Sequence, residues 1–578
     1  MKRKETFLEK LIFAILESTL LKILVLMITV GLFAFSIYMI APSEIVKAKM
    51  LPGKDSDSFS VYVDLPKNSS VKATKEVTDC IAGELMKESA VTSVSVFIGE
   101  GQPLDFAGMV KGSALKMDEN EAEVMVNIAR AHDRHERSYN LISRVRPVVQ
   151  EKCTFNNANI KFIELPAGPP VLASIVAEVY GGKSYEKRRE VAYDIAEVLK
   201  KQDKLVDVDV LADEDTYRYG LILDTNEVLN SGVELEQVKK MLYIAFEGMG
   251  MGYVNSDNAE NQIPIFLRLD DSRLLAKDSV KTIEKKLFDL KLMNPMGLMI
   301  PMSQFVKVQK VKQAPTITSK DLNNMINVIA ETDNESQIYP LLDARSMILE
   351  SLTDKYNVEP GSMLNLKLTD KQTGEQFDII WDGELKVTID TFIDLGGAFI
   401  GALVLIFFLM VVYYHNFGLA GGIVLSSFLS LVGVIFGHYV MDKITPDPFY
   451  LTATSLIGFI GLIGINSRNS LLIIDFAKQL IHDDGHHSHR AIAIATATRA
   501  KPILLTVLAI VLASSLLATD AVFGGLGVAL IGGTIFAFFV SLFFVPIVIQ
   551  GPLKHYDDTG ELDSDVLHSP DEKQCDLE

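Results

Sequence analysis

The stretch of sequence that decides the fold is residues 464–478, which read GINSRNSLLIIDFAK. It lies in a long apolar segment, and six uncharged residues separate Arg468 from Asp475. An arginine at membrane depth costs about 2.5 kcal/mol or more unless it faces a polar interior, so such residues are functional candidates. We therefore expect Arg468 to need a buried carboxylate and Asn469 to need a polar partner. The alternative is that the span ends at Ile465 and that Arg468 reaches the membrane surface.

A second polar pattern opens the next apolar segment, at residues 499–506, which read RAKPILLT. Arg499 and Thr506 are seven residues apart, which is two helical turns, so both side chains can face one interior site. Pro502 is compatible with a position near a helix start. The alternative is that Arg499 and Lys501 only anchor the cytoplasmic end of the segment.

The composition indicates a membrane protein with a large polar part. Of the 578 residues, 48% are hydrophobic and 22% are charged, so the apolar residues must be concentrated in blocks. A helical span needs about 20 apolar residues. Basic residues before the first span and between the fourth and fifth place both termini in the cytoplasm. The predicted spans are residues 20–40, 395–413, 419–440, 450–474, 503–517 and 522–549.

Roughly 350 residues between the first two spans contain no spanning segment, so we expect them outside the cytoplasm. Their hydrophobic patterns first predict strand, helix, strand, strand, helix and strand, which is the order of a ferredoxin-like split βαβ unit. These elements are at residues 59–64, 70–89, 91–97, 121–129, 138–150 and 160–165. The pattern then begins again, is interrupted by about a hundred residues, and is completed afterwards. Its elements are at residues 171–180, 185–201, 205–211, 325–331, 342–355 and 377–381.

The charge and the cysteines exclude several classes of site. A net charge of -19 and the lack of a basic stripe argue against nucleic acid as a partner. Cys80, Cys153 and Cys575 are too few and too widely spaced for a zinc site or a disulfide framework. We interpret them as buried thiols, although Cys80 and Cys153 could pair if they meet in space.

Four methionines lie three residues apart around two prolines, and they could form a soft-metal ladder or adaptable packing. We favour packing for this set, which is Met293, Met296, Met299 and Met302. No cofactor and no metal site are predicted. No motif supports an enzyme.

Together these stretches resemble the second half of resistance-nodulation-division permeases of the acriflavine-resistance, or hydrophobe-amphiphile, type. Residues 464–477 are similar to the pattern G-L-x-[AS]-K-N-x-I-L-[IL]-V-[ED]-F-A of the family's tenth span. Residues 499–506 are similar to the R-x-R-P-I-L-M-T start of its eleventh span. Residues 297–303, GLMIPMS, are similar to a G-x-x-V-P-L-S turn of its soluble part. The resemblance covers the whole chain except an acidic tail.

The resemblance implies an α+β membrane protein: a six-helix transmembrane bundle, two ferredoxin-like periplasmic porter subdomains and an inserted docking subdomain. The expected organisation follows the chain from a cytoplasmic N-terminus to a cytoplasmic, disordered acidic tail. Its parts are 1–41 (N-terminus and first span), 42–168 (first porter subdomain), 169–212 with 313–392 (second porter subdomain), 213–312 (docking insert), 393–550 (spans two to six) and 551–578 (tail).

The resemblance also implies proton-driven efflux of drugs or other amphiphilic small molecules across the inner membrane, by a trimer. A periplasmic adaptor and an outer-membrane channel would complete the pump. In the family a proton taken up by an Asp pair is relayed through polar residues of the tenth and eleventh spans. The matching positions are Arg468, Arg499 and Thr506, with Asn469 adjacent.

Two departures from the family pattern matter. The family's lysine is replaced by Arg468, whose guanidinium stays charged, so it can act only as a fixed counter-ion. The Asp pair has no counterpart, because Asp394, Asp475 and Asp520 lie only at the ends of predicted spans. We therefore expect a partner that supplies the N-terminal half of the permease and its carboxylates.

Three other functions compete with this interpretation. A protein-export accessory subunit would also have six spans, but it would carry an aspartate where this chain has Arg468. A heavy-metal efflux member of the same family is a second alternative. A membrane-anchored binding or sensing module is a third, and it predicts no polar residues inside the spans, contrary to residues 464–478.

Overall fold

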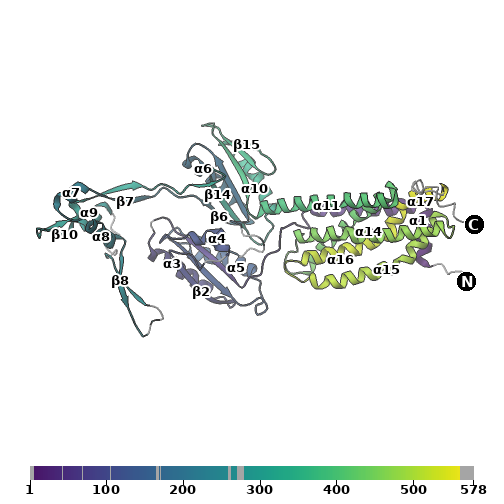
Figure 1. Ribbon diagram of the computed structural model, residues 1–578, viewed down its shortest axis with the longest axis horizontal. Helices are drawn as coiled ribbons and strands as arrows, with labels where there is room; N and C mark the ends of the chain where they lie inside the picture. The colour runs from purple at the N-terminus through teal and green to yellow at the C-terminus, as the bar shows by residue number, and fades with distance from the viewer. Residues whose placement is uncertain are drawn as a thin grey trace, which may run out of the picture. The chain divides into compact units, whose positions relative to one another are not determined.

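The computed structural model describes residues 6–559 except 42, 68, 104–105, 165–167, 169–170, 258, 260–261 and 270–278. The chain divides into two compact units, one of residues 1–211 with 318–578 and one of residues 212–317. The first unit contains two α/β modules and a bundle of long apolar helices (Figure 1).

The first α/β module is a four-stranded antiparallel sheet in the order β2-β3-β1-β4. Its strands form because apolar side chains alternate along them, and Val61 and Val124, which lie opposite one another, are fully buried. The N-cap Ser70 accepts a hydrogen bond from the backbone N–H of Ala73 and starts α3. The elements are β1 (Ser58–Asp64), α3 (Val71–Leu85), β2 (Val91–Ile98), α4 (Phe106–Lys111), β3 (Glu121–Ile128), α5 (Ser138–Cys153) and β4 (Asn159–Ile163).

Helices α3 and α5 are joined by a disulfide between Cys80 and Cys153, whose Cα atoms are 5.7 Å apart. The sequence interpretation of these residues as free buried thiols is therefore wrong. The two cysteines are 73 positions apart in the sequence, and the packing of both helices in one core brings them together.

The second α/β module repeats the strand order of the first. Strands β6, β14, β5 and β17 are neighbours in that sequence, all antiparallel. The hairpin β15–β16, which the sequence patterns did not predict, extends the sheet beyond β17. The elements are β5 (Ile175–Gly181), α6 (Tyr185–Leu199), β6 (Leu205–Leu211), β13 (Thr318–Lys320), β14 (Asn323–Thr332), α10 (Ile338–Ser351), β15 (Tyr356–Pro360), β16 (Leu366–Asp370) and β17 (Gln376–Asp382).

The second unit, residues 212–317, has its own small core around Val228, Leu287, Met302 and Phe305. Strands β7 and β12 pair along their whole length at the two ends of the unit. The elements are β7 (Tyr217–Leu223), α7 (Thr225–Ser231), α8 (Leu235–Phe246), β8 (Met249–Val254), β9 (Ile263–Leu267), α9 (Ser279–Asp289), β10 (Lys291–Met293), β11 (Met299–Pro301), η3 (Met302–Gln304) and β12 (Val306–Lys312).

The four methionines of this unit are not all packed, so the packing interpretation is wrong for three of them. Met293, Met296 and Met299 are 64%, 80% and 58% exposed because they lie on the β10–β11 hairpin and its turn. Only Met302 is buried in the core.

Within the described residues, six helical stretches are long and apolar enough to cross a membrane, as the sequence predicts. Four of them extend well beyond the predicted bounds because polar residues continue the helix past its apolar part: α11 begins at Glu384, α14 ends at His482, α15 begins at Ser488 and α17 ends at Thr559. The stretches are α2 (Thr19–Ile40), α11 (Glu384–Tyr414), α12 (Phe417–Leu429) with α13 (Leu431–Ile444), α14 (Ala453–His482), α15 (Ser488–Leu517), and α16 (Gly524–Phe539) continued by the π-helix η4 (Val540–Phe544) and α17 (Val545–Thr559).

Further helices lie near the two ends of the chain, one before the first span and α17 at the end of the last one. Helix α1 (Phe7–Glu17) precedes the first span and packs with α15 and α17. Because α17 is helical to Thr559, the disorder predicted from residue 551 is wrong for its first nine residues. Residues 560–578 of that tail lie outside the described residues.

Candidate functional site

Helix α14 carries the residues that the sequence places at membrane depth. It begins with a capping box, in which Thr452 and Ser455 satisfy each other's backbone N–H groups. The helix does not end at Ile465, and Arg468 is its sixteenth residue of thirty. Arg468 therefore lies halfway along a continuous candidate span.

Arg468 is an exposed residue on the surface of the helix bundle. Ile457, Gly461 and Gly464 are exposed on the same face at spacings of three or four residues, and Gln479 is exposed eleven residues, about three turns, beyond Arg468. A Cβ atom added to Gly461 or Gly464 would meet nothing within 4 Å. We call this stripe, from Ile457 to Gln479 with Arg468 at its centre, the open face of α14.

The opposite side of α14 is polar and hydrogen-bonds inside the chain, although the buried Nδ2 of Asn466 has no partner among the described residues. Ser467 and Ser470 contact Ser427 and Ser426 of α12, each with 3.1 Å between the hydroxyl oxygens. Ser541 of the π-helix donates to Oδ1 of Asn466 over 3.3 Å. Hydrogen bonds of this kind join helices in an apolar medium.

Asn469 lies on this buried side, with only 2% of its surface exposed. One residue of α-helix turns the side chain by about 100°, so Arg468 and Asn469 leave α14 in different directions. The structure therefore does not bring these two predicted site residues together. Sequence reasoning also missed Asn466, which the same GINSRNS stretch displays.

The two predicted residues of α15 lie close to the level of Arg468. Counted from the loop that joins α14 to α15, Arg468 is fourteen residues along its helix, Arg499 eleven and Thr506 eighteen. At about 1.5 Å per residue, Arg499 and Thr506 each lie within roughly 6 Å of the level of Arg468 along the bundle, on opposite sides of that level.

These residues do not contact one another in the described part of the chain. The Arg499 guanidinium lies over the ring of Phe476, 4.9 Å from its centre. The Thr506 hydroxyl donates to the Pro502 carbonyl over 3.1 Å, within its own helix. Among the described residues, no carboxylate forms an ion pair with Arg468, and neither Arg499 nor Thr506 bonds to it.

The three carboxylates that the sequence singled out are elsewhere. Asp475 accepts a hydrogen bond from the Tyr414 hydroxyl over 2.7 Å. Asp394 is exposed on α11. Asp520 accepts from the backbone N–H groups of Val522 and Phe523, which lowers the pKa of its carboxyl. Among the residues described, none of these pairs with Arg468.

Known proteins share this combination of two α/β modules and a bundle of candidate membrane helices. The AcrB/AcrD/AcrF family matches residues 1–549. The chain belongs to this family of permeases. It is therefore a relative of multidrug efflux transporters, and the six candidate spans make it a multi-pass membrane protein.

The relatives show the size of the shared region. Multidrug export protein AcrF of Escherichia coli is 22% identical over 521 residues, which are 86% of this chain and 45% of that protein. The multidrug/solvent efflux pump membrane transporter MepB of Pseudomonas putida is also 22% identical, over 87% of this chain and 44% of its own length. The crystal structure of a heavy metal efflux pump matches with a TM-score of 0.69 at 16% identity, over 94% of this chain and 51% of that one. The chain spans about half the length of these relatives.

Proposed function

We propose that this chain is one half of a proton-driven efflux permease of the resistance-nodulation-division type, and that it exports drugs or other amphiphilic small molecules. The other half would supply the carboxylates that bind the proton. The observation that carries this proposal is Arg468, a charge halfway along a candidate span that is exposed and has no ion pair in the described chain. A charge at membrane depth needs a partner.

The open face of α14 is suited to a helix of the other half. Gly461 and Gly464 have free space where a side chain would begin, and small residues let membrane helices approach closely. A partner helix on this face would bring its carboxylates beside Arg468. Their pKa values would fall next to the fixed positive charge, and protonation would free Arg468 to change partners.

The other parts of the predicted pump support the same proposal. The strand order β2-β3-β1-β4, with α3 and α5 between the strands, supports a ferredoxin-like unit for the first α/β module. The matching order β6-β14-β5-β17 supports the same for the second. We infer that these modules are the periplasmic porter subdomains and that residues 212–317 are the docking insert, which meets an adaptor and an outer-membrane channel in a trimer.

We infer that the protein resides in the inner membrane with both termini in the cytoplasm. Six candidate spans and the basic residues before the first of them support this orientation. Reporter fusions at Glu121 and at Asp565 test it, because the first should report from the periplasm and the second from the cytoplasm. Reports from the same side would contradict the orientation.

The test of the proposed function is gradient-dependent dye efflux by the chain co-expressed with a first-half partner that carries an Asp pair in its fourth span. Arg468→Ala should abolish efflux while the protein still inserts, since losing a charge makes the span more apolar. Arg468→Lys should keep part of the activity, because the charge remains and the planar donor fork is lost.

The matched control is Lys554→Ala, which removes an exposed cation from α17. It should transport as the parent does. Normal efflux by Arg468→Ala at equal membrane levels would show that Arg468 is only an anchor, and the assignment of Arg499 and Thr506 would lose its main support.

A further inference from the structure

The two α/β modules meet along two strands that are at the edges of their sheets. In the described part of the chain, β4 pairs only with β1 and β6 pairs only with β14. Edge strands expose unpaired backbone groups that can join another sheet, and proteins often block this with charges and bulges. Here β4 carries Lys161, and β6 carries Asp207 and Asp209.

Asp207 is held in an unusual conformation. Its φ angle is +52°, in the left-handed region that a non-glycine residue rarely adopts. The pairing of β6 with β14 shifts at this point, so that Asp207 and Val208 lie opposite the single residue Ala330. A bulge of this kind redirects a side chain. It turns the Asp207 carboxylate away from its own sheet.

The described donors around Asp207 belong to the first module. Its Oδ2 accepts from the backbone N–H of Phe162 over 3.0 Å and lies 3.3 Å from Nε of Arg146. Its Oδ1 accepts from the amide of Gln150 over 2.9 Å. The Asp207 side chain is only 1% exposed. Burial raises the pKa of this carboxyl, and Arg146 offsets part of that rise.

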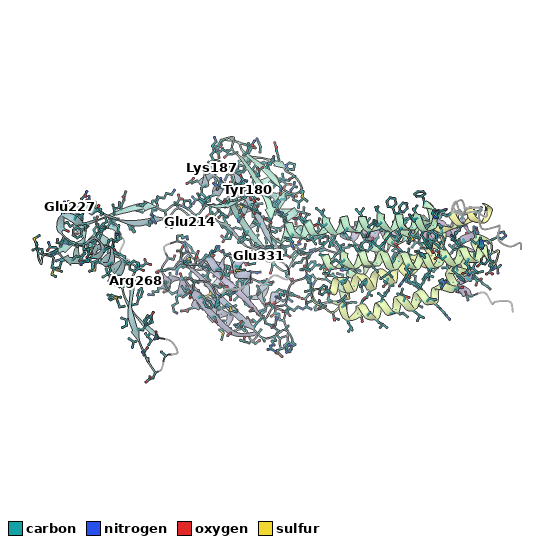
Figure 2. The ribbon with its side chains drawn as sticks, viewed as in Figure 1. Tyr180, Lys187, Glu214, Glu227, Arg268 and Glu331 are labelled. Carbon is teal, nitrogen blue, oxygen red and sulfur yellow. A yellow bond between two sulfur atoms is a disulfide. The ribbon has the colours of Figure 1, made fainter. Side chains whose placement is uncertain are left out.

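Three further ion pairs cross between the modules. Arg146 binds Asp333 (3.0 Å), Lys161 binds Asp209 (2.6 Å) and Lys111 of α4 binds Glu331 (2.6 Å). Glu331, labelled in Figure 2, lies on β14. Burial would raise the pKa of the Glu331 carboxyl, but the Lys111 ammonium holds it below its ordinary value.

The charges are sorted by module. In the described ion pairs between the modules, every cation belongs to the first and every carboxylate to the second. A cavity of about 90 Å³ lies beside them, lined by Arg146, Phe162, Ser174 and Glu331 among others. Buried ion pairs therefore make up much of this part of the contact. Charges can be hydrated again when two surfaces separate, which suits a contact that opens.

We propose that this row of cations facing carboxylates is a latch that holds the two α/β modules together, with Asp207 as its central residue. Breaking the latch frees the edges of β4 and β6 and lets the modules separate. The latch is independent of the proposed transport function, because it concerns only the contact between two modules of this chain.

Hydrogen–deuterium exchange of the purified full chain tests the latch without any transport assay. The backbone N–H of Phe162 points away from its own sheet and is protected by Asp207, so peptides covering residues 158–164 report on the contact. The double variant Asp207→Asn with Asp209→Asn removes two charges and keeps the side-chain volumes. Exchange in these peptides should become at least about tenfold faster, with the central strand β3 unchanged.

The matched control is Asp194→Asn, whose carboxylate accepts from Lys355 and Tyr356 inside the second module. It should leave exchange at residues 158–164 unchanged. Exchange at the parent rate in the double variant would overturn the latch.

A second variant covers the case in which the double variant also exchanges faster in β3. The Ser143 hydroxyl and Asp333 carboxylate oxygens are 2.5 Å apart across the contact, so Ser143→Cys with Asp333→Cys can join the modules by a disulfide. Added to the double variant and oxidised, this link should restore slow exchange at residues 158–164. Failure to restore it would overturn the proposal, since the modules would then be linked and still open.

Discussion

Arg146 and Arg468 are both arginines on helices of this chain, and they differ in how their charge is met. Arg146 of α5 is 4% exposed and lies within 3.3 Å of both Asp207 and Asp333, which come from the neighbouring module. Arg468 of α14 is exposed and has no ion pair within the described residues. The chain itself supplies carboxylate partners for Arg146, and its described residues supply none for Arg468.

This difference in pairing indicates two different roles for an arginine whose charge is costly to remove from water. A buried ion pair that is fully partnered can specify how two parts of a protein meet. A charge presented on the surface of a membrane bundle contributes nothing to that bundle and gains a partner only from outside it. We infer that Arg146 organises the fold and that Arg468 serves the assembled pump.

The largest expected effect on the fold is that of Arg146→Ala. Removing one partner leaves Asp207 buried without its counter-charge, which costs about 3–5 kcal/mol. Denaturant unfolding in detergent, followed by the fluorescence of Trp381, the single tryptophan, measures this in the second module.

The control for Arg146→Ala is two residues away on the same helix. Arg144 pairs with Glu88 and Glu136, but its side chain is 51% exposed. Arg144→Ala should cost less than about 1 kcal/mol, as exposed pairs do. Equal losses for the two variants would contradict the contrast between buried and exposed charge.

Glycines of the helix bundle give a smaller effect that compares the inside of the bundle with its open face. A Cβ added to Gly433 of α13 would overlap with the Gly532 carbonyl oxygen of α16, at a distance much shorter than van der Waals contact. The two helices would have to move apart to make room for it. Gly433→Ala should cost about 1–3 kcal/mol, as overpacking does. Thermal loss of helical circular dichroism in detergent measures it.

Gly464→Ala on the open face is the matched control. Its added Cβ meets nothing within 4 Å, so the melting temperature of the isolated chain should stay the same or rise slightly, because alanine favours the helix. A large loss here would mean that the open face is packed inside the chain itself.

The smallest expected effect is that of Arg468→Ala on the fold of the chain alone. An exposed side chain without an ion pair should change the free energy of unfolding by no more than about 0.5 kcal/mol. The same thermal measurement applies. A loss comparable to that of Arg146→Ala would show that Arg468 has a partner within this chain.

The sequence predicted most of the two α/β modules because alternating apolar residues report directly on a half-buried strand. Strand β1 was predicted at 59–64 and lies at Ser58–Asp64, and α6 was predicted at 185–201 and lies at Tyr185–Leu199. The hairpin β15–β16 was missed, since it lies in a polar stretch between two predicted elements. Contacts between distant residues, such as Cys80 with Cys153, depend on the three-dimensional packing.

The candidate site was only partly predictable. The type of these residues and their expected depth in the membrane singled out Arg468 and Asn469. Residue type and depth do not show which side of α14 packs against the rest of the chain. Hydrophobicity cannot decide this, because both sides of a membrane helix are largely apolar. The latch was invisible for the same kind of reason, since the left-handed conformation of Asp207 arises from a bulge between strands more than a hundred residues apart.

The central claim is that this chain transports only together with a first half that supplies proton-binding carboxylates. Dye efflux driven by a proton gradient tests it most directly, in a host deleted for related pumps. The chain alone should show no efflux above the empty host, and co-expression with a first half carrying an Asp pair in its fourth span should restore it. Efflux by the chain alone, abolished when the gradient is collapsed, would contradict the account.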